Sequence, residues 1–202
     1  WSLVFFIAPL IITSWDFLSH SYIDWYRLLQ VKHKRNIDLT INNDFQDISV
    51  MGMIKRIFNY PTFNSLFVLI PAVLMVLSQF LRISDFSDLR YRIYICCSVM
   101  ISTVIFSSGA ESPTYIIAFT AVCIWYVIQN KSKLINAVFI FALIFTSFSY
   151  SDLLTPAFRE QIVRPYSLKA FPCLVIWIIL FFQILKKQYR SLSFEKLALH
   201  NQ

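Results

Sequence analysis

The chain has 202 residues, of which 57% are hydrophobic and only 14% charged, and its formal net charge is +7. Soluble domains carry about 25% charged residues, so this composition excludes an ordinary water-soluble fold and indicates an integral membrane protein. The positive charge does not indicate a nucleic-acid partner, because the basic residues are scattered between apolar runs, where they act as topology signals.

The first apolar run covers about residues 1–13, and the chain begins with Trp1 inside it. No positively charged segment precedes this run and no small-residue cleavage site follows it, so it lacks the pattern of a signal peptide. The simplest interpretation is a C-terminal fragment of a longer protein, with residues 1–202 forming a single transmembrane domain.

Residues 14–32 have the pattern of an amphipathic helix, with Ser14 as its expected N-cap. Large apolar or aromatic residues recur every three or four positions and fall on one face: Trp15, Leu18, Tyr22, Trp25 and Leu29. Such a face favours a helix lying in the membrane interface, with its Trp and Tyr rings at headgroup depth. Aromatic faces also stack on sugar rings, so Trp25 is a candidate substrate-binding residue.

Residues 44–58 predict a second interfacial helix, capped by Asp44 and supported in its first turn by Asp47. Its apolar stripe comprises Ile48, Met51, Ile54 and Phe58. Lys55 and Arg56 come late, where cations suit the helix dipole. Either of these side chains is a candidate to hold a lipid phosphate.

Five further apolar runs follow along the chain. They cover about 65–81, 93–107, 113–129, 134–148 and 168–185. Most are slightly shorter than the roughly 20 residues that cross a bilayer as a helix, but boundary Tyr, Ser and Asn residues extend them. The runs are continuous rather than alternating, which excludes strands. With the run at 1–13, we expect an all-α polytopic membrane protein with about six transmembrane helices.

The distribution of Lys and Arg predicts the orientation of these spans. The connections 82–92 and 130–133 and the tail 186–202 alternate so that they share one side, and they hold nine basic residues. On the other side, 108–112 has none and 149–167 has two. We therefore expect a multi-pass protein of the cell (inner) membrane with a cytoplasmic C-terminus, and expect the long segment 14–64 to lie outside.

Glu111 stands between two apolar runs, at the expected outer boundary, and is followed by Ser112 and Pro113. One interpretation is structural, because a carboxylate before a first-turn proline suits a helix N-terminus. The other interpretation is functional: Glu111 would accept hydrogen bonds from the hydroxyls of a sugar, or orient a basic partner such as Arg164, at the mouth of a cavity.

The outer stretch 149–169 contains the remaining candidate residues. Arg164 lies against the membrane on the side that arginine normally avoids, which indicates an anionic partner, and guanidinium recognises phosphate through two parallel hydrogen bonds. Arg159 and Tyr166 lie beside it as candidate substrate-binding residues, although Arg159 also suits a solvated surface. Lys169 lies just inside the next span, from which its ammonium can snorkel to the surface.

The four cysteines all lie inside apolar runs, where a free cysteine behaves as a small hydrophobic residue. No Cys-x-x-Cys is present, and none of the three histidines is spaced to join a cysteine in a metal site. We therefore expect neither a metal nor another cofactor.

Three pieces resemble, in order and spacing, the C-terminal part of glycosyltransferase family 87, in the GT-C superfamily, and its Bacteroidetes-type members most closely. They read "DFQDISVMGMIKRIF", "AESPTYIIAFTAVCIWY" and "FREQIVRPYSLKAFPCLVIW". The resemblance spans roughly residues 15 to 185. It implies a polytopic enzyme that takes a sugar, usually mannose, from a polyprenyl-phosphate donor and passes it to a lipid or glycan acceptor at the outer face.

The resemblance also has gaps. The family's presumed catalytic base is an Asp in the first outer loop, which nothing here matches, so no catalytic residue is assigned. Actinobacterial members follow their Ser-Pro with Trp and paired His, whereas Ser112-Pro113 is followed by Thr114 and Tyr115. A donor-phosphate role would then pass to Arg164 or Lys169.

Other classes of membrane protein remain open. A polymerase or ligase of lipid-linked glycans usually carries a large arginine-rich outer loop late in the chain, and 149–167 is short for one. A transporter usually shows paired Gly and Pro breaks inside its spans and a polar site at mid-membrane. A non-catalytic scaffold fits the missing base.

Overall fold

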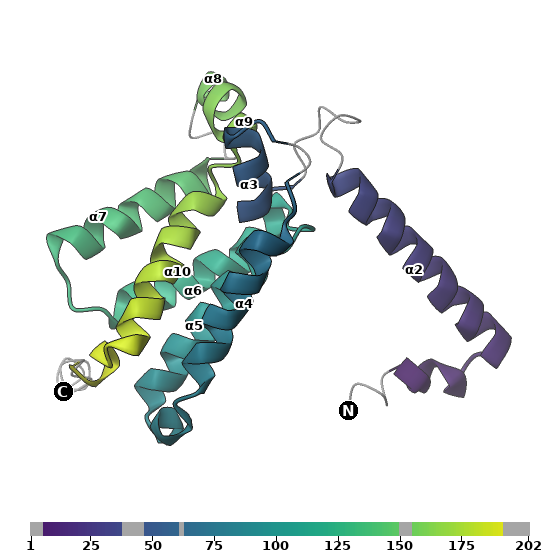
Figure 1. Ribbon diagram of the computed structural model, residues 1–202, viewed down its shortest axis with the longest axis horizontal. Helices are drawn as coiled ribbons and strands as arrows, with labels where there is room; N and C mark the ends of the chain where they lie inside the picture. Colours follow the sequence, from purple (N-terminus) through teal and green to yellow (C-terminus); the bar gives the residue numbers. More distant parts are fainter. Residues whose placement is uncertain (1–5, 38–46, 61–62, 150–154, 192–202) are drawn as a thin grey trace. The chain divides into compact units, whose positions relative to one another are not determined.

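The computed structural model describes residues 6–37, 47–60, 63–149 and 155–191, and within these ranges the chain is helical, with no strand (Figure 1). The all-α prediction is therefore confirmed. The chain divides into two units, Trp1–Asn43 and Asp44–Gln202.

The first unit consists of the 3₁₀ helix η1 (Ala8–Ile11) and the long helix α2 (Trp15–Ile37). The predicted amphipathic helix is confirmed, with the Ser14 hydroxyl accepting a hydrogen bond from the amide of Phe17 at 3.4 Å. The predicted membrane helix over 1–13 is not seen in residues 6–13. Pro9 lies in the 3₁₀ turn there, and the amides of Ile12 and Thr13 both bond back to its carbonyl.

The second unit begins with α3 (Val50–Ile57), which is shorter than the helix predicted over 44–58. Its N-cap is Ser49, whose hydroxyl accepts a hydrogen bond from the amide of Gly52 at 3.1 Å. The prediction placed the cap at Asp44, which lies outside the described residues. Serine caps as well as aspartate does, so the two were indistinguishable by residue type.

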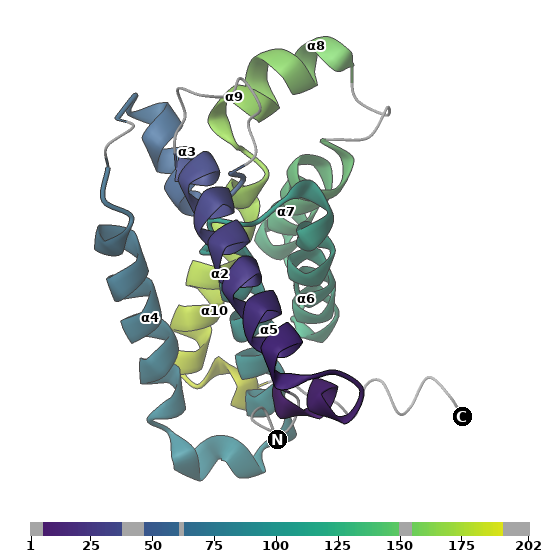
Figure 2. The ribbon, with the colours of Figure 1, turned by 90° about the vertical axis from the view of Figure 1, so that its right-hand side faces the viewer.

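Four of the five later apolar runs form helices that pack side by side (Figures 1 and 2). They are α4 (Leu66–Phe80), α5 (Leu89–Ile105), α6 (Tyr115–Ile128) and α10 (Ala170–Leu185). The fifth forms α7 (Lys133–Ala142), which continues as the π-helix η4 (Leu143–Phe148). α5 lies at the centre, with its most extensive contacts to α6 and α10.

Small residues on α6 let these central helices approach closely. Ala118 and Ala121 are completely buried, as are Val122 and Trp125 on the same helix. From α10, the buried Ile176, Trp177 and Leu180 complete the core, and the Trp177 ring meets Phe106 edge-on at 5.1 Å. Small side chains at helix contacts favour dispersion contacts between neighbouring backbones, whether the solvent is lipid or water.

The stretch expected as an outer loop is helical from Pro156 to Tyr166. It comprises α8 (Pro156–Phe158), the π-helix η5 (Arg159–Val163) and α9 (Arg164–Tyr166). The amide of Arg164 bonds to the carbonyl of Arg159, a π-type bond directly before Pro165, which has no amide hydrogen to give. The loop prediction was wrong because Pro156 opens a helix and Pro165 is accommodated by the π-turn.

Within the described residues, no helix by itself has both the length and the apolar character to cross a membrane. One pair passes this test together: Pro156–Tyr166 and Ala170–Leu185, which are bent by 55° across a short break. Ser167, in the break, has a left-handed φ of 50°. Lys169 is the N-cap of α10, so it lies before the helix and not just inside it as predicted.

The bundle has two polar ends. The first, which we call the α3 end, gathers α3, α9 and the 3₁₀ helix η3 (Ser112–Thr114) that leads into α6. The second, the η2 end, gathers the 3₁₀ helices η2 (Ile83–Ser87) and η6 (Gln188–Ser191), which both contact α5. Three of the segments predicted to share the outer face, those of α3, η3 and α9, therefore meet at one end of the second unit.

Candidate functional site

At the α3 end, the first turn of α3 lies very close to the backbone of Asp47, which precedes it. The Asp47 carboxylate accepts a hydrogen bond from the amide of Ser49 at 3.0 Å. Gly52 faces this turn, and a Cβ atom there would lie 2.5 Å from the Asp47 carbonyl oxygen and 2.9 Å from its carboxyl carbon. Glycine is therefore required at residue 52, because only a residue without a side chain leaves room for Asp47.

Arg56 ties α3 to the break before α10. Its guanidinium donates to the Asp47 carbonyl at 2.9 Å, to the Arg164 carbonyl at 3.2 Å and to the Ser167 hydroxyl. The Ser167 hydroxyl in turn donates to the Asp47 carbonyl at 3.2 Å. These bonds hold the left-handed residue in place, so Arg56 acts as a structural clasp.

Lys169 ties the same break to the start of α6. Its ammonium nitrogen lies 2.6 Å from the Ser112 hydroxyl and 3.3 Å from the Ser112 carbonyl, and 5.4 Å from the centre of the Tyr115 ring. The Tyr115 hydroxyl donates to the carbonyl of Ile48, and the Ile48 amide bonds to Ala110 at 3.3 Å. Segments around residues 48, 112 and 168 thus form one connected cluster.

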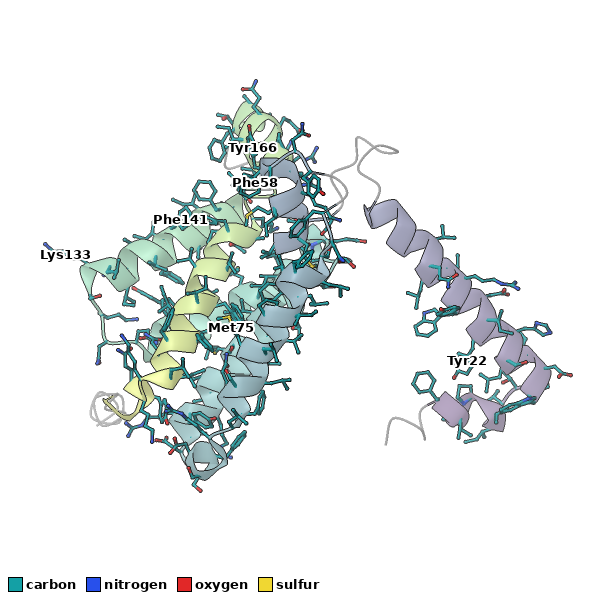
Figure 3. All side chains as sticks on the ribbon, viewed as in Figure 1. Tyr22, Phe58, Met75, Lys133, Phe141 and Tyr166 are labelled. Carbon is teal, nitrogen blue, oxygen red and sulfur yellow. The ribbon has the colours of Figure 1, made fainter. Side chains whose placement is uncertain are left out.

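The other predicted site residues are arranged less tightly. Glu111 is exposed at the N-cap of η3, where its amide donates to the Thr114 hydroxyl at 2.9 Å. Tyr166 is partly exposed at the α3 end, on the α9 segment that contacts α3 (Figure 3). Trp25 is exposed on α2, in the first unit.

Arg159 and Arg164 both reach the carboxylate of Glu160, at 3.3 Å and 3.0 Å. The structure therefore gives Arg164 an acidic neighbour on its own helical segment, one turn away. A partly exposed pair of this kind contributes little to stability, so the guanidinium remains able to exchange partners.

The structure distinguishes Lys55 from Arg56, which the sequence analysis treated as equivalent candidates to hold a lipid phosphate. It is 3% exposed, and among the described residues no atom accepts a hydrogen bond from its ammonium group. Its positive charge lies near enough to Asp47 to lower the pKa of that carboxyl. The positions of the two side chains therefore differ in kind: Arg56 is engaged by the protein, whereas Lys55 retains donors for an anion.

Two titratable groups in the cluster are shifted by their surroundings. Burial raises the pKa of the Asp47 carboxyl, against the hydrogen bonds from Ser49 and the nearby charges of Arg56 and Lys55, which lower it. Burial lowers the pKa of the Lys169 ammonium to about 8, and the nearby Cys173 acts weakly in the opposite sense. Both shifts favour the neutral form of the group.

An apolar groove of about 290 Å³ lies between α4 and α5. Its lining includes Leu69, Val73, Val99 and Phe106, with the hydroxyls of Ser102 and Thr103 bonded to carbonyls of their own helix. A groove with this lining can take an aliphatic chain but offers no recognition of a sugar.

Sequence reasoning missed Asp47 as a buried site residue and Ser112 as the partner of Lys169. A signal for the first was present: only two glycines occur in the chain, and one of them follows Ser49 by three residues. The Ser112–Lys169 contact joins residues that are far apart along the chain, and no local pattern predicts such a pair.

Comparisons with protein-family models, with curated proteins and with solved structures found no match to this chain.

Proposed function

We propose that this chain is part of a multi-pass membrane glycosyltransferase that moves a sugar, of the mannose type, from a polyprenyl-phosphate donor to a lipid or glycan acceptor. The observation that carries the proposal is the meeting of three separate segments at the α3 end, around residues 48, 112 and 168. These are the three pieces in which the chain resembles glycosyltransferase family 87.

The chemistry of such a transfer asks for cations at the departing phosphate. Lys55 is the residue to which we assign that role, because its side chain is largely buried and its ammonium has donors to spare, while Arg56 is committed to holding the break. Arg164 would add a second cation by exchanging Glu160 for the phosphate. The acidic Glu111 would face the sugar hydroxyls at the rim.

The apolar surroundings fit a substrate that is anchored in a bilayer. The exposed face of α4 carries the large apolar residues Leu66, Phe67, Ile70 and Leu74. In the proposed arrangement these residues face lipid, the apolar groove takes part of an isoprenoid chain, and the α3 end lies at the outer boundary. The C-terminus would then be cytoplasmic.

The test uses the full chain reconstituted in lipid nanodiscs and a short-chain polyprenyl phosphate as the probe. Lys55→Met should weaken binding of the probe about tenfold or more, the loss of one charge-assisted bond. Lys133→Met, an exposed lysine at the start of α7, is the matched control and should bind like the parent.

Thermal unfolding of the same samples separates binding from folding. Because the Lys55 ammonium makes no hydrogen bond to the described residues, its replacement by an apolar side chain of similar size should leave the protein about as stable as before. Equal binding by the parent and Lys55→Met would contradict the assignment of the phosphate site. Failure of the parent to bind either polyprenyl phosphate or a mannosyl-phosphoryl polyprenol would contradict the transferase itself.

A further inference from the structure

The contact between Ser112 and Lys169 has the geometry of a nucleophile and its base. The amine nitrogen and the hydroxyl oxygen are 2.6 Å apart, within the range expected for a serine that passes its proton to a neighbouring lysine. We propose that Ser112 is an activated nucleophile, that Lys169 is its general base, and that the pair accepts the acyl group of a membrane-lipid ester. This activity goes beyond sugar transfer and does not depend on it.

The fold disfavours the charged form of this lysine. Lys169 is 5% exposed, and it is the N-cap of α10 while Ser112 opens η3 and, through it, α6. The positive ends of two helix dipoles therefore meet at the amine. With its pKa lowered to about 8, roughly a tenth of the amine is neutral at pH 7, and a neutral amine can accept a proton.

Groups from two neighbouring helices face the amine. They include the Ser112 hydroxyl and carbonyl, the Tyr115 ring from α6 and the Cys173 thiol from α10. The Thr146 hydroxyl of η4 fixes the position of Lys169 by donating to its carbonyl at 3.2 Å. Ser112 is only half-buried, so the base is enclosed while the nucleophile can be reached.

The surface beside Ser112 indicates the class of substrate. Ile116 and Ile117, on the next turn, are 73% and 43% exposed, so a molecule that approaches the hydroxyl meets aliphatic surface. An ester of an aliphatic acyl chain fits this surface better than a polar substrate does. Activated serines react with such carbonyl carbons.

The proposed reaction balances with water or a second alcohol as its only further reactant. As the Ser112 oxygen forms a bond to the carbonyl carbon, its proton moves to the Lys169 amine. The bond from the carbonyl carbon to the lipid alcohol then breaks, and the proton moves from Lys169 to the departing oxygen. Water or a second alcohol repeats both steps on the acyl-serine, which returns the free hydroxyl and the neutral amine.

An alkyl fluorophosphonate on the full chain in nanodiscs tests this proposal, with mass spectrometry to locate the adduct. We expect the adduct on Ser112, no adduct there in Ser112→Ala, and an unchanged adduct in the control Ser107→Ala. Lys169→Met should slow labelling by about 100-fold, the usual contribution of a general base. The labelling rate of the parent should rise with pH and level off above about pH 8, as the amine loses its proton.

Lys169→Arg guards against a folding artefact. Arginine keeps the charge and the donors that hold Ser112 but does not act as a base, so labelling should be lost while the unfolding temperature is retained. Absence of an adduct on Ser112, or labelling that persists in both Lys169 variants, would reduce the contact to a structural hydrogen bond. Binding of polyprenyl phosphate through Lys55 is read separately, so the two proposals can fail independently.

Discussion

The two polar ends of the bundle use the same kinds of residue for different purposes. At the η2 end the Asp85 carboxylate accepts a hydrogen bond from the Tyr189 hydroxyl at 2.7 Å and lies 3.8 Å from the Lys187 ammonium. Arg82 donates to the last carbonyls of α10, those of Leu185 at 2.8 Å and Ile184 at 3.4 Å. Here each charge serves to close a helix end.

A side-chain network deepens this pattern at the η2 end. The amides of Gln129 and Gln183 bond to each other at 2.9 Å, Trp125 donates to Gln183 at 3.0 Å, and Gln129 donates to the Tyr94 hydroxyl at 2.8 Å. The network links α5, α6 and α10, and its members satisfy one another. Such a network fixes helix positions and leaves little for a ligand to bind.

The α3 end contains a similar clasp but also retains reactive groups. Arg56 closes a helix end there much as Arg82 does at the other. Beside it, however, lie the buried Lys55 and the Ser112–Lys169 pair. The comparison teaches that a polar cluster is a candidate site when donors or a nucleophile remain after its structural bonds are counted.

The largest expected effect comes from comparing the loss of Arg56 at the α3 end with the loss of Arg82 at the η2 end. Arg56→Ala should lower the free energy of unfolding by about 3 kcal/mol, because it leaves the carbonyls of Asp47 and Arg164 without a charged donor in a part-buried site. Arg82→Ala should cost about 1 kcal/mol, because its stronger bond, to Leu185, is exposed. Equal losses in thermal or denaturant unfolding of the two variants would mean that the ends do not differ in this respect.

A smaller effect, of about 2 kcal/mol, is expected from Gly52→Ala, because the new Cβ would overlap the backbone of Asp47 and force the turn to shift. Gly109→Ala is the matched control, since its Cβ would meet nothing closer than the Ser107 hydroxyl at 3.8 Å. The unfolding temperatures of the two variants provide the measurement. If Gly52→Ala unfolds like Gly109→Ala, the close approach at the start of α3 is not a constraint on the sequence.

Much of the fold could be predicted from hydrophobic runs alone. Continuous apolar stretches predicted α4 to α7 and α10 within a few residues, because a buried or lipid-facing helix leaves a long, unbroken signal. The helix over 156–166 was missed because its two prolines and mixed charges are typical of a loop. In the described part of the run at 1–13 the chain forms a 3₁₀ turn at Pro9, which the apolar character of the run did not indicate.

The candidate site was predictable only as three separate pieces. Local patterns marked Lys55 and Arg56 as equivalent cations, since both lie in the last turn of α3. The bonds from Arg56 to Arg164 and Ser167, more than a hundred residues later, made them different. Side-chain contacts between distant segments depend on how the helices pack, and no spacing within the sequence records that.

The smallest expected changes in stability come from replacing two buried glutamines. They test whether every polar group at the η2 end has only a structural role. Gln183→Leu should destabilise the bundle by about 0.5–1 kcal/mol, the lower part of the usual range for one hydrogen-bonding side chain. Gln79, on α4, is fully buried, yet neither atom of its amide finds a hydrogen-bond partner among the described residues. Gln79→Leu should therefore be neutral or stabilising, because it removes a polar group that burial has left unsatisfied. Its backbone carbonyl, which accepts a bond from the Tyr91 hydroxyl, is untouched by the change.

Unfolding of both variants in the same lipid provides the measurement. A loss of stability in Gln79→Leu as large as that in Gln183→Leu would show that the Gln79 amide is bound after all, and the η2 end would then hold a polar site of its own.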